Sequence, residues 1–102
     1  MFAMRIVSEK PLRDFWQKHP AAEQPLRNWI QATKAASWYS FADVRNTFRA
    51  ADTYKRCVIF DIGGNNYRLT AKINYRIKIV FVRQVMTHKE YDSGFWKGDY
   101  EV

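Results

Sequence analysis

Two neighbouring stretches in the second half of the chain carry side chains that could cleave a phosphodiester. Arg68 lies in "YRLTAKI", and Arg83, His88 and Tyr91 lie in "VRQVMTHKEYD". Histidine titrates near neutrality, tyrosine donates a proton or stacks on a base, and arginine stabilises charge on a phosphate. Metal-free RNA cleavage needs one group to deprotonate the ribose 2′-OH, cations beside the phosphorane, and one group to protonate the departing 5′-oxygen. These four residues are therefore our candidate catalytic set.

The strand that carries Arg68 also has an ordinary explanation. In "YRLTAKI" one face is apolar, while Arg68, Thr70 and Lys72 lie on the other face. Arg68 and Lys72 are roughly 13–14 Å apart along such a strand, as on the solvated face of any antiparallel sheet. Spacing alone favours this structural explanation, although a row of cations on a rigid strand also suits RNA phosphates.

The remaining candidates can be explained structurally one by one. His88 would be a surface histidine at a strand end, and Tyr91 an anchor at the edge of the core. Arg83 would be the partner of Asp61 or Glu90. The clustering of His88 and Tyr91 with two arginines is what favours chemistry over these separate explanations.

Other chemistry fits the sequence poorly. His19 and His88 are the only histidines, and no acid or cysteine lies at metal-ligand spacing around them. The "GGNN" turn precedes a strand rather than a helix, so it does not resemble a phosphate-binding loop. Cys57 lies in an apolar run, where a free cysteine behaves as a small hydrophobe. We expect no metal and no cofactor.

Composition limits the class of protein. The chain has 102 residues, 47% of them hydrophobic and 17% aromatic, so we expect one globular domain over residues 1–102. Its formal charge of +7 favours a polyanion partner, most often nucleic acid, over a merely soluble basic protein. No apolar run approaches the roughly 20 residues of a membrane span, and the N-terminus lacks a signal peptide pattern, so we expect a cytoplasmic protein without membrane contact.

The first half of the chain reads as a short strand followed by helices. "AMRIV" is a strand candidate, and Ser8 is a plausible N-cap for the helix after it. A second helix begins between Glu23 and Pro25, and "SFAD" at residues 40–43 resembles a capping box that opens a short third helix. Two helical stripes point toward a core, the first formed by Leu12, Phe15, Trp16 and His19, the second by Leu26, Trp29, Ile30 and Thr33.

The second half changes to the period of strands. "RCVIFDI", "YRLTAKI" and "RIKIVFVRQVM" are separated by turns at "GGNN" and at Asn74–Tyr75, which predicts a meander of three antiparallel strands. The sequence therefore predicts an α+β fold, with N-terminal helices packed on one face of a small, mainly antiparallel sheet. We expect the four tryptophans to fill the core rather than stack on bases.

The stretches "FDIGGNNYRLTAKI" and "IKIVFVRQVMTHKEYD" together resemble the HigB-like toxins of bacterial type II toxin–antitoxin systems. They resemble more distantly the wider RelE-like group of ribosome-associated mRNA endonucleases. The resemblance covers Met4 to Asp92. It implies a RelE-like toxin domain that cleaves mRNA without a metal, often in the ribosomal A site. The implied partners are mRNA, the ribosome and a cognate helix-turn-helix antitoxin of the HigA-like kind.

The resemblance also assigns residues. Arg68 in "YRL" matches the arginine that RelE-like enzymes carry on the equivalent strand, and Tyr91 is the best match in "THKEYD", beside His88 and Lys89. The second strand departs from RelE, which has catalytic lysines there, since this chain has Asp61.

The general base therefore stays open among Lys55, Lys72 and His88, with His88 favoured for its pKa. Lys55, Arg56, Lys72 and Lys89 are our candidate RNA-binding residues. Two functions of another class stay open: a ParE-like toxin that binds DNA gyrase, and a module that only binds the ribosome or RNA.

Overall fold

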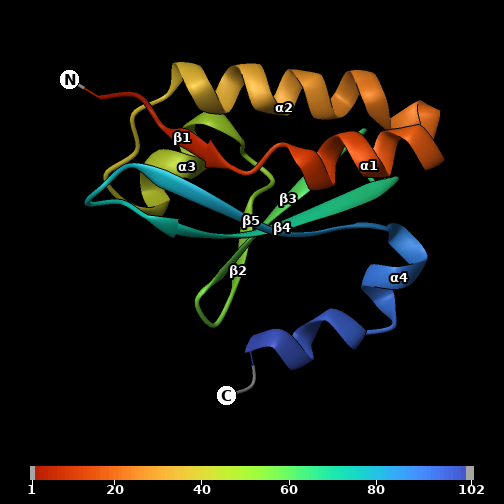
Figure 1. Cartoon of the computed structure of the whole chain (residues 1–102). Helices are drawn as coiled ribbons and strands as arrows, with labels where there is room; N and C mark the ends of the chain where they lie inside the picture. The colour runs from red at the N-terminus through yellow and green to blue at the C-terminus, as the bar shows by residue number, and fades with distance from the viewer. Residues whose placement is uncertain (1, 101–102) are drawn as a thin grey trace.

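The computed structural model describes residues 2–100, apart from the side chains of residues 99 and 100 (Figure 1). In chain order the elements are β1 (Arg5–Val7), α1 (Lys10–Lys18), the 3-10 helix η1 (Pro20–Ala22), α2 (Glu23–Ala35), α3 (Phe41–Thr47), β2 (Asp52–Tyr54), β3 (Cys57–Ile62), β4 (Tyr67–Asn74), β5 (Ile79–Thr87), α4 (His88–Asp92) and the 3-10 helix η2 (Phe95–Tyr100). None of the helices in this part of the chain has the length and apolar character that a membrane span needs.

The five strands form one sheet in the order β1-β5-β4-β3-β2. β1 runs parallel to β5, and the other neighbours are antiparallel. This confirms the predicted α+β fold with a mainly antiparallel sheet. β2 was not expected, because "ADTY" has too few apolar residues to read as a strand. It forms by pairing with Cys57–Ile59 across a tight turn, in which Lys55 has a φ of 54°.

The N-terminal helices cover one face of the sheet, as predicted. In Figure 1, α1 and α2 run above the sheet, and the chain after β5 lies below it. The helical stripes and the inward faces of β3, β4 and β5 meet in one hydrophobic core. Its buried members include Leu12, Leu26, Trp29, Trp38, Val44, Val58, Phe60, Ile62, Leu69, Ala71 and Val80.

The predicted caps of the first and third helices differ from the observed ones. α1 begins one residue later than Ser8 would place it, with Glu9 at the N-cap and no side-chain capping bond. α3 does begin after Ser40, but the Ser40 side chain makes no cap bond. Instead, the Asp43 carboxylate accepts a hydrogen bond from the backbone N–H of Tyr39 at 2.8 Å. The capping signal therefore located the third helix correctly, but the Asp43 carboxylate accepts from the N–H of Tyr39 rather than from that of Ser40.

The "GGNN" turn joins β3 to β4 as expected. Gly63 and Gly64 have φ values of 62° and 67°, a region that side-chain-bearing residues rarely adopt. The turn sets the register in which Asp61 lies directly across from Arg68. One residue from the charged pair, Phe60 lies across from Leu69 on the opposite, core-facing side of the hairpin.

The face of the sheet opposite the N-terminal helices has a second, smaller hydrophobic cluster. Cys57, Ile59, Met86 and Trp96 form it, and Tyr54 and Tyr91 pack against it. Trp96 and Tyr91 come from η2 and α4, two elements that the strand-and-helix pattern did not predict. A capping box starts α4: the Thr87 hydroxyl accepts from the Glu90 N–H, and the Glu90 carboxylate accepts from the Thr87 N–H.

Candidate active site

Arg68 is buried in the sheet rather than exposed on it. Only 8% of its surface is accessible. Its Nε lies 3.1 Å from Oδ1 of Asp61, one Nη donates to the Tyr67 carbonyl at 3.1 Å, and the other Nη donates to the side-chain oxygen of Asn65. A guanidinium with this many partners is held in one orientation, and part of its donor set remains for an incoming phosphate.

The Tyr91 ring lies against Arg68 and is itself held from behind. The ring centroid is 5.1 Å from the Arg68 guanidinium carbon, a cation–π distance. On its other side Tyr91 stacks on Trp96 at 5.2 Å and 11°, and the Trp96 indole N–H donates to the Tyr91 carbonyl at 2.9 Å. Tyr54 closes the row edge-on to Trp96 at 5.4 Å. The row Arg68–Tyr91–Trp96–Tyr54 joins β4, α4, η2 and β2 into one unit, which we call the aromatic row.

The environment of Tyr91 keeps its hydroxyl protonated. Burial raises the pKa of Tyr91 above its ordinary value of 10. The Arg68 guanidinium opposes this by lowering the pKa, while the carboxylates of Asp52 and Asp61 add to the rise. Because the net shift is upward, Tyr91 is neutral at physiological pH and can donate a proton but not accept one.

His88 begins α4 and is paired with Asp92 one turn later. The distance from His88 Nδ1 to Asp92 Oδ2 is 2.7 Å. The His88 backbone N–H also donates to the Asn66 carbonyl at 3.0 Å, which ties α4 to the "GGNN" turn. With Nδ1 donating to the carboxylate, the other ring nitrogen, Nε2, is left to accept a proton. His88 and Tyr91 are three residues apart on one helix, so their Cβ atoms are roughly 5–6 Å apart.

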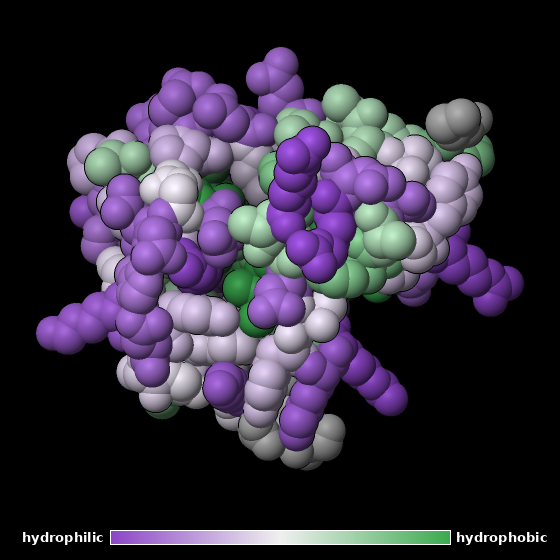
Figure 2. All heavy atoms as spheres, turned by 180° about the vertical axis from the view of Figure 1, so that it is seen from behind, coloured by the Kyte–Doolittle hydropathy of each residue, from purple (hydrophilic) through white to green (hydrophobic). Residues whose placement is uncertain are grey.

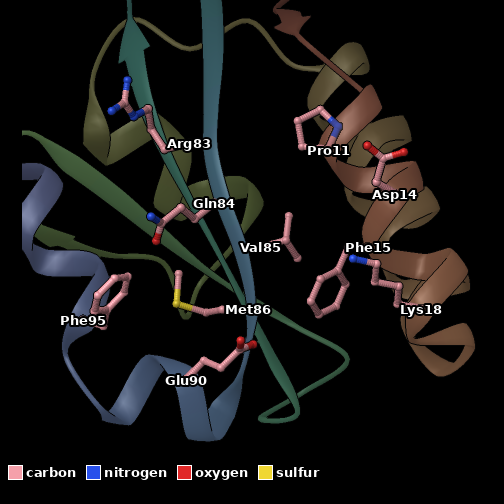
Figure 3. Close-up of a pocket in the computed structure, with 10 residues that line it drawn as sticks. All are labelled: Pro11, Asp14, Phe15, Lys18, Arg83, Gln84, Val85, Met86, Glu90 and Phe95. Carbon is pink, nitrogen blue, oxygen red and sulfur yellow. The ribbon is translucent and has the colours of Figure 1, made fainter.

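Arg83 lies on the same sheet face but away from Arg68. The pairing of Thr70 with Gln84 and of Ala71 with Val82 leaves Arg83 as the extra residue of a β-bulge. In Figure 3, Arg83 points to the same side of β5 as Gln84. It lines a groove of about 390 Å³ between α1 and the C-terminal segment, together with Pro11, Asp14, Phe15, Lys18, Gln84, Val85, Met86, Glu90 and Phe95.

Neither acid that the sequence offered as a partner for Arg83 is assigned to it. Asp61 pairs with Arg68, and the Glu90 carboxylate caps α4 through the Thr87 N–H at 2.8 Å. Arg68 lies across from Met86, three residues along β5 from Arg83, which corresponds to about 10 Å. The structure thus brings Arg68 and Tyr91 into contact, places His88 on the same short helix as Tyr91, and leaves Arg83 about 10 Å from Arg68 along the sheet.

The four candidate RNA-binding residues are spread around the aromatic row. Lys55 and Arg56 are exposed in the β2–β3 turn, and Lys55 Nζ is 5.8 Å from the Tyr54 ring. Lys72 is half-buried on β4, and Lys89 is exposed on α4. Figure 2, the view from behind, shows long hydrophilic side chains projecting around the molecule rather than gathered in one patch.

Three residues of this site were expected in other roles. Asp61 was considered as a partner of Arg83, but a four-residue turn after Ile62 places it across from Arg68. Asn65 was assigned to the turn alone, but it also accepts from Arg68. Trp96 was assigned to the core. It is buried, yet in the second cluster, where it supports Tyr91. No periodicity in the sequence points to that contact.

The described residues hold no group of three His, Cys, Asp or Glu side chains that come close enough to bind a metal ion.

Comparison with known proteins shows the family to which the chain belongs. Residues 22–94 match the model of the HigB toxin family, described as the RelE-like toxic component of a toxin–antitoxin system. The chain belongs to the HigB toxin family. The matched segment includes the whole β3–β4 hairpin, β5 and α4, and it ends at Gly94, before Trp96.

Named relatives of the HigB family align over nearly the whole chain. The protein is 30% identical over 93 residues to the mRNA interferase HigB of Escherichia coli O6:H1, covering 88% of this chain and 90% of the relative. It is 27% identical over 92 residues to the mRNA interferase toxin HigB of Escherichia coli K12 and to the mRNA interferase HigB of Shigella flexneri, covering 87% of this chain and 88% of each. The resemblance read from the two C-terminal stretches is thereby confirmed.

Proposed function

We propose that this protein is the toxin of a type II toxin–antitoxin system and an endoribonuclease that cleaves mRNA, inhibiting translation and growth. The relatives named above as mRNA interferases support the activity. The observation that carries the chemistry is the contact between the Arg68 guanidinium and the ring of Tyr91. It places a fixed cation against the ring of a tyrosine whose hydroxyl is protonated, and a cation and a proton donor are two of the three groups that metal-free cleavage of RNA requires.

The roles follow from protonation states and geometry. His88, with Nδ1 directed to Asp92, removes the proton from the ribose 2′-OH, and the 2′-oxygen attacks the adjacent phosphorus. Arg68 stabilises the negative charge of the phosphorane. Tyr91, whose hydroxyl is protonated at neutral pH, gives its proton to the departing 5′-oxygen. The products are a 2′,3′-cyclic phosphate and a free 5′-hydroxyl.

Lys55 and Lys72 fit the base role less well than His88. Lys55 is exposed in a turn, and Lys72 is roughly 13–14 Å from Arg68 along β4. We assign them, with Arg56 and Lys89, to RNA binding. Arg83 is assigned to the phosphate next to the cleaved one, because it lies about 10 Å from Arg68 along the sheet.

The ribosome and a HigA-like helix-turn-helix antitoxin complete the proposal as partners in the cytoplasm. Asp61 partly neutralises the Arg68 guanidinium at the centre of the site. A site of this kind gains from a second molecule that positions its substrate, which favours cleavage on the ribosome.

Primer extension on mRNA after induced expression tests this function. We expect growth arrest and new 5′ ends inside translated codons, and we expect these ends to disappear when translation is blocked. Intact mRNA together with altered DNA supercoiling would replace this function with gyrase binding. Cuts that persist without translation would remove the ribosome from the proposal and keep the nuclease.

A further inference from the structure

The sheet face that carries Arg68 has two differently covered ends. Towards α4, the second hydrophobic cluster covers the face, with Met86 and Ile59 buried beneath Trp96. The β4–β5 turn lies at the opposite end of the sheet in Figure 1. Near that end Phe81 is 37% exposed, although it belongs to the longest strand of the sheet.

Phe81 lies between an apolar and a basic neighbour. It is the register partner of Val7 on β1 and of Lys72 on β4. Ile6 packs against the main core, so alternation along β1 directs Val7 and Arg5 to the face of Phe81. Val7 is itself 39% exposed. An exposed aromatic ring on a rigid strand is unusual on a solvated sheet, where polar residues normally alternate with the core positions.

Among the described residues of β1, β4 and β5 that share a face with Phe81, the charges are all of one sign. The residues that β1, the end of β4 and the beginning of β5 direct to this face are Arg5, Val7, Lys72, Asn74, Ile79, Phe81 and the bulge residue Arg83. They include three cations and no acid. A ring flanked by cations is the arrangement with which proteins bind single-stranded nucleic acid, since the ring stacks on a base and the cations contact phosphates.

We infer that Phe81, Lys72, Arg5 and Arg83 form a binding platform for single-stranded RNA, on which one base of the substrate stacks against Phe81. This inference rests on the proposed nuclease function and extends it to a second contact on the substrate. The platform is continuous with the cleavage site: Lys72 is four residues from Arg68 on the same strand, roughly 13–14 Å away. RNA bound at Arg68 and Tyr91 therefore extends across Phe81 within a few nucleotides.

RNA fits this face better than a protein segment does. The apolar residues of this face are Val7, Ile79 and Phe81, while the core of a protein interface is larger and poor in charge. RNA needs only one stacking ring and a row of cations. Stacking on an aromatic side chain tolerates any base, so the platform contributes affinity and alignment rather than codon preference.

Phe81→Ala tests the platform. The probe is a single-stranded RNA of about 12 nucleotides, matched to common site sizes, with 2′-O-methyl groups that prevent cleavage and one 2-aminopurine as a stacking reporter. We expect the wild-type protein to bind it and quench the reporter. Phe81→Ala should weaken binding about 10- to 100-fold and abolish quenching, whereas Phe81→Tyr should keep both. Lys72→Ala and Arg5→Ala should each reduce the slope of log affinity against log salt by about 0.7.

Ile77→Ala is the matched control, since Ile77 is 53% exposed in the β4–β5 turn and lies outside the platform. It should bind like the wild type. Equal affinity and equal quenching in the wild type and Phe81→Ala would overturn the platform, as would absence of RNA binding by the wild type. Phe81→Ala that loses affinity for the antitoxin but not for RNA would make this face a protein interface instead. Failure of the nuclease function is separate, because it shows as wild-type expression without new mRNA ends.

Discussion

Arg68 has two roles to separate, since the residue proposed to stabilise the phosphorane is also a structural anchor. The Arg68→Lys substitution keeps the positive charge but replaces a planar fork by a single ammonium group. At best the lysine reaches one of the three acceptors, Asp61, Asn65 or the Tyr67 carbonyl. Asp61→Asn is the complementary variant, because it breaks the ion pair and leaves the guanidinium in place.

The structure sets the size of both effects. A hydrogen bond to a charged group contributes about 1.5–3 kcal/mol, and Arg68→Lys loses two of them. The Asp61 side chain is 34% exposed, so water partly replaces what it loses, and we take the lower end. We expect Arg68→Lys to lower the free energy of unfolding by about 3 kcal/mol and Asp61→Asn by about 1–2 kcal/mol. Neither loss unfolds a domain of ordinary stability, about 5–15 kcal/mol.

The effects on cleavage should separate the two variants more clearly than the effects on stability do. Loss of a preorganised donor to the transition state costs about 10²–10³ in rate, so Arg68→Lys should lower cleavage by that factor. Asp61→Asn should stay within about tenfold of the wild type, because the catalytic cation is retained. Urea denaturation gives the stabilities, and primer extension in a translating extract gives cleavage at a temperature where each variant is folded. Arg13→Lys, on an exposed helix position, is the matched control.

One result would refute this reasoning. If cleavage by both variants falls only in proportion to the fraction of folded protein, Arg68 is an anchor for the hairpin and contributes nothing to the reaction. Full activity of Arg68→Lys would lead to the same conclusion. A rate loss in Arg68→Lys that exceeds its loss of folded protein, with Asp61→Asn largely active, supports the phosphate role.

Four further predictions concern α4 and the segment after it. Tyr91→Phe should keep the stack on Trp96 and change the free energy of unfolding by less than about 1 kcal/mol. It should nevertheless lower the rate of cleavage by a factor of about 10²–10⁴, and the same two assays measure both effects. Undiminished cleavage would exclude Tyr91 as the acid. The pKa of Tyr91 is higher in the folded state than in the unfolded state. The stability that Tyr91 contributes through this shift is therefore complete below about pH 10 and is lost as the pH rises through the folded-state pKa. Above about pH 10, the urea midpoint should fall less steeply with pH in Tyr91→Phe than in the wild type. Trp96 is 2% exposed, so Trp96→Ala should lower the free energy of unfolding, measured by urea denaturation, by about 3–5 kcal/mol. Trp96→Phe removes the hydrogen bond to the Tyr91 carbonyl but keeps a ring, so it should lower the free energy of unfolding by about 1–2 kcal/mol. Equal losses in the two variants would show that the stack contributes little. His88→Gln should lower cleavage by about 10²–10⁴, and cleavage at the wild-type rate would return the base role to Lys55 or Lys72.

The β3–β4 hairpin was predictable in nearly every respect. Two strand-like runs flank a turn whose glycines accept positive φ, and the period of two separates the core face from the polar face. The same register places Asp61 opposite Arg68, so even the ion pair was available from counting. A tight hairpin is determined by residues a few positions apart, and such residues can be read directly from the sequence.

The C-terminal segment shows a signal that was present but not used. "THKE" at residues 87–90 is a capping box, and it begins α4. The run of apolar residues in β5 directed attention to strand periodicity, so the helix start was not expected. A helix as short as α4 depends on its cap and on its packing more than on the propensity of its residues.

The sequence by itself determined the α+β class, the helical stripes, the hairpin and the residue types that could cleave RNA, because each depends on neighbours a few positions apart. Only the tertiary structure decided what covers the second face of the sheet. There, residues from β2, β4, α4 and η2 meet in the row Arg68–Tyr91–Trp96–Tyr54. That row buries Arg68 and raises the pKa of Tyr91 through burial, while Phe81 lies outside it on the same face and stays exposed. Contacts between segments this far apart in the chain depend on burial and packing of the whole fold, which no periodicity in the sequence records.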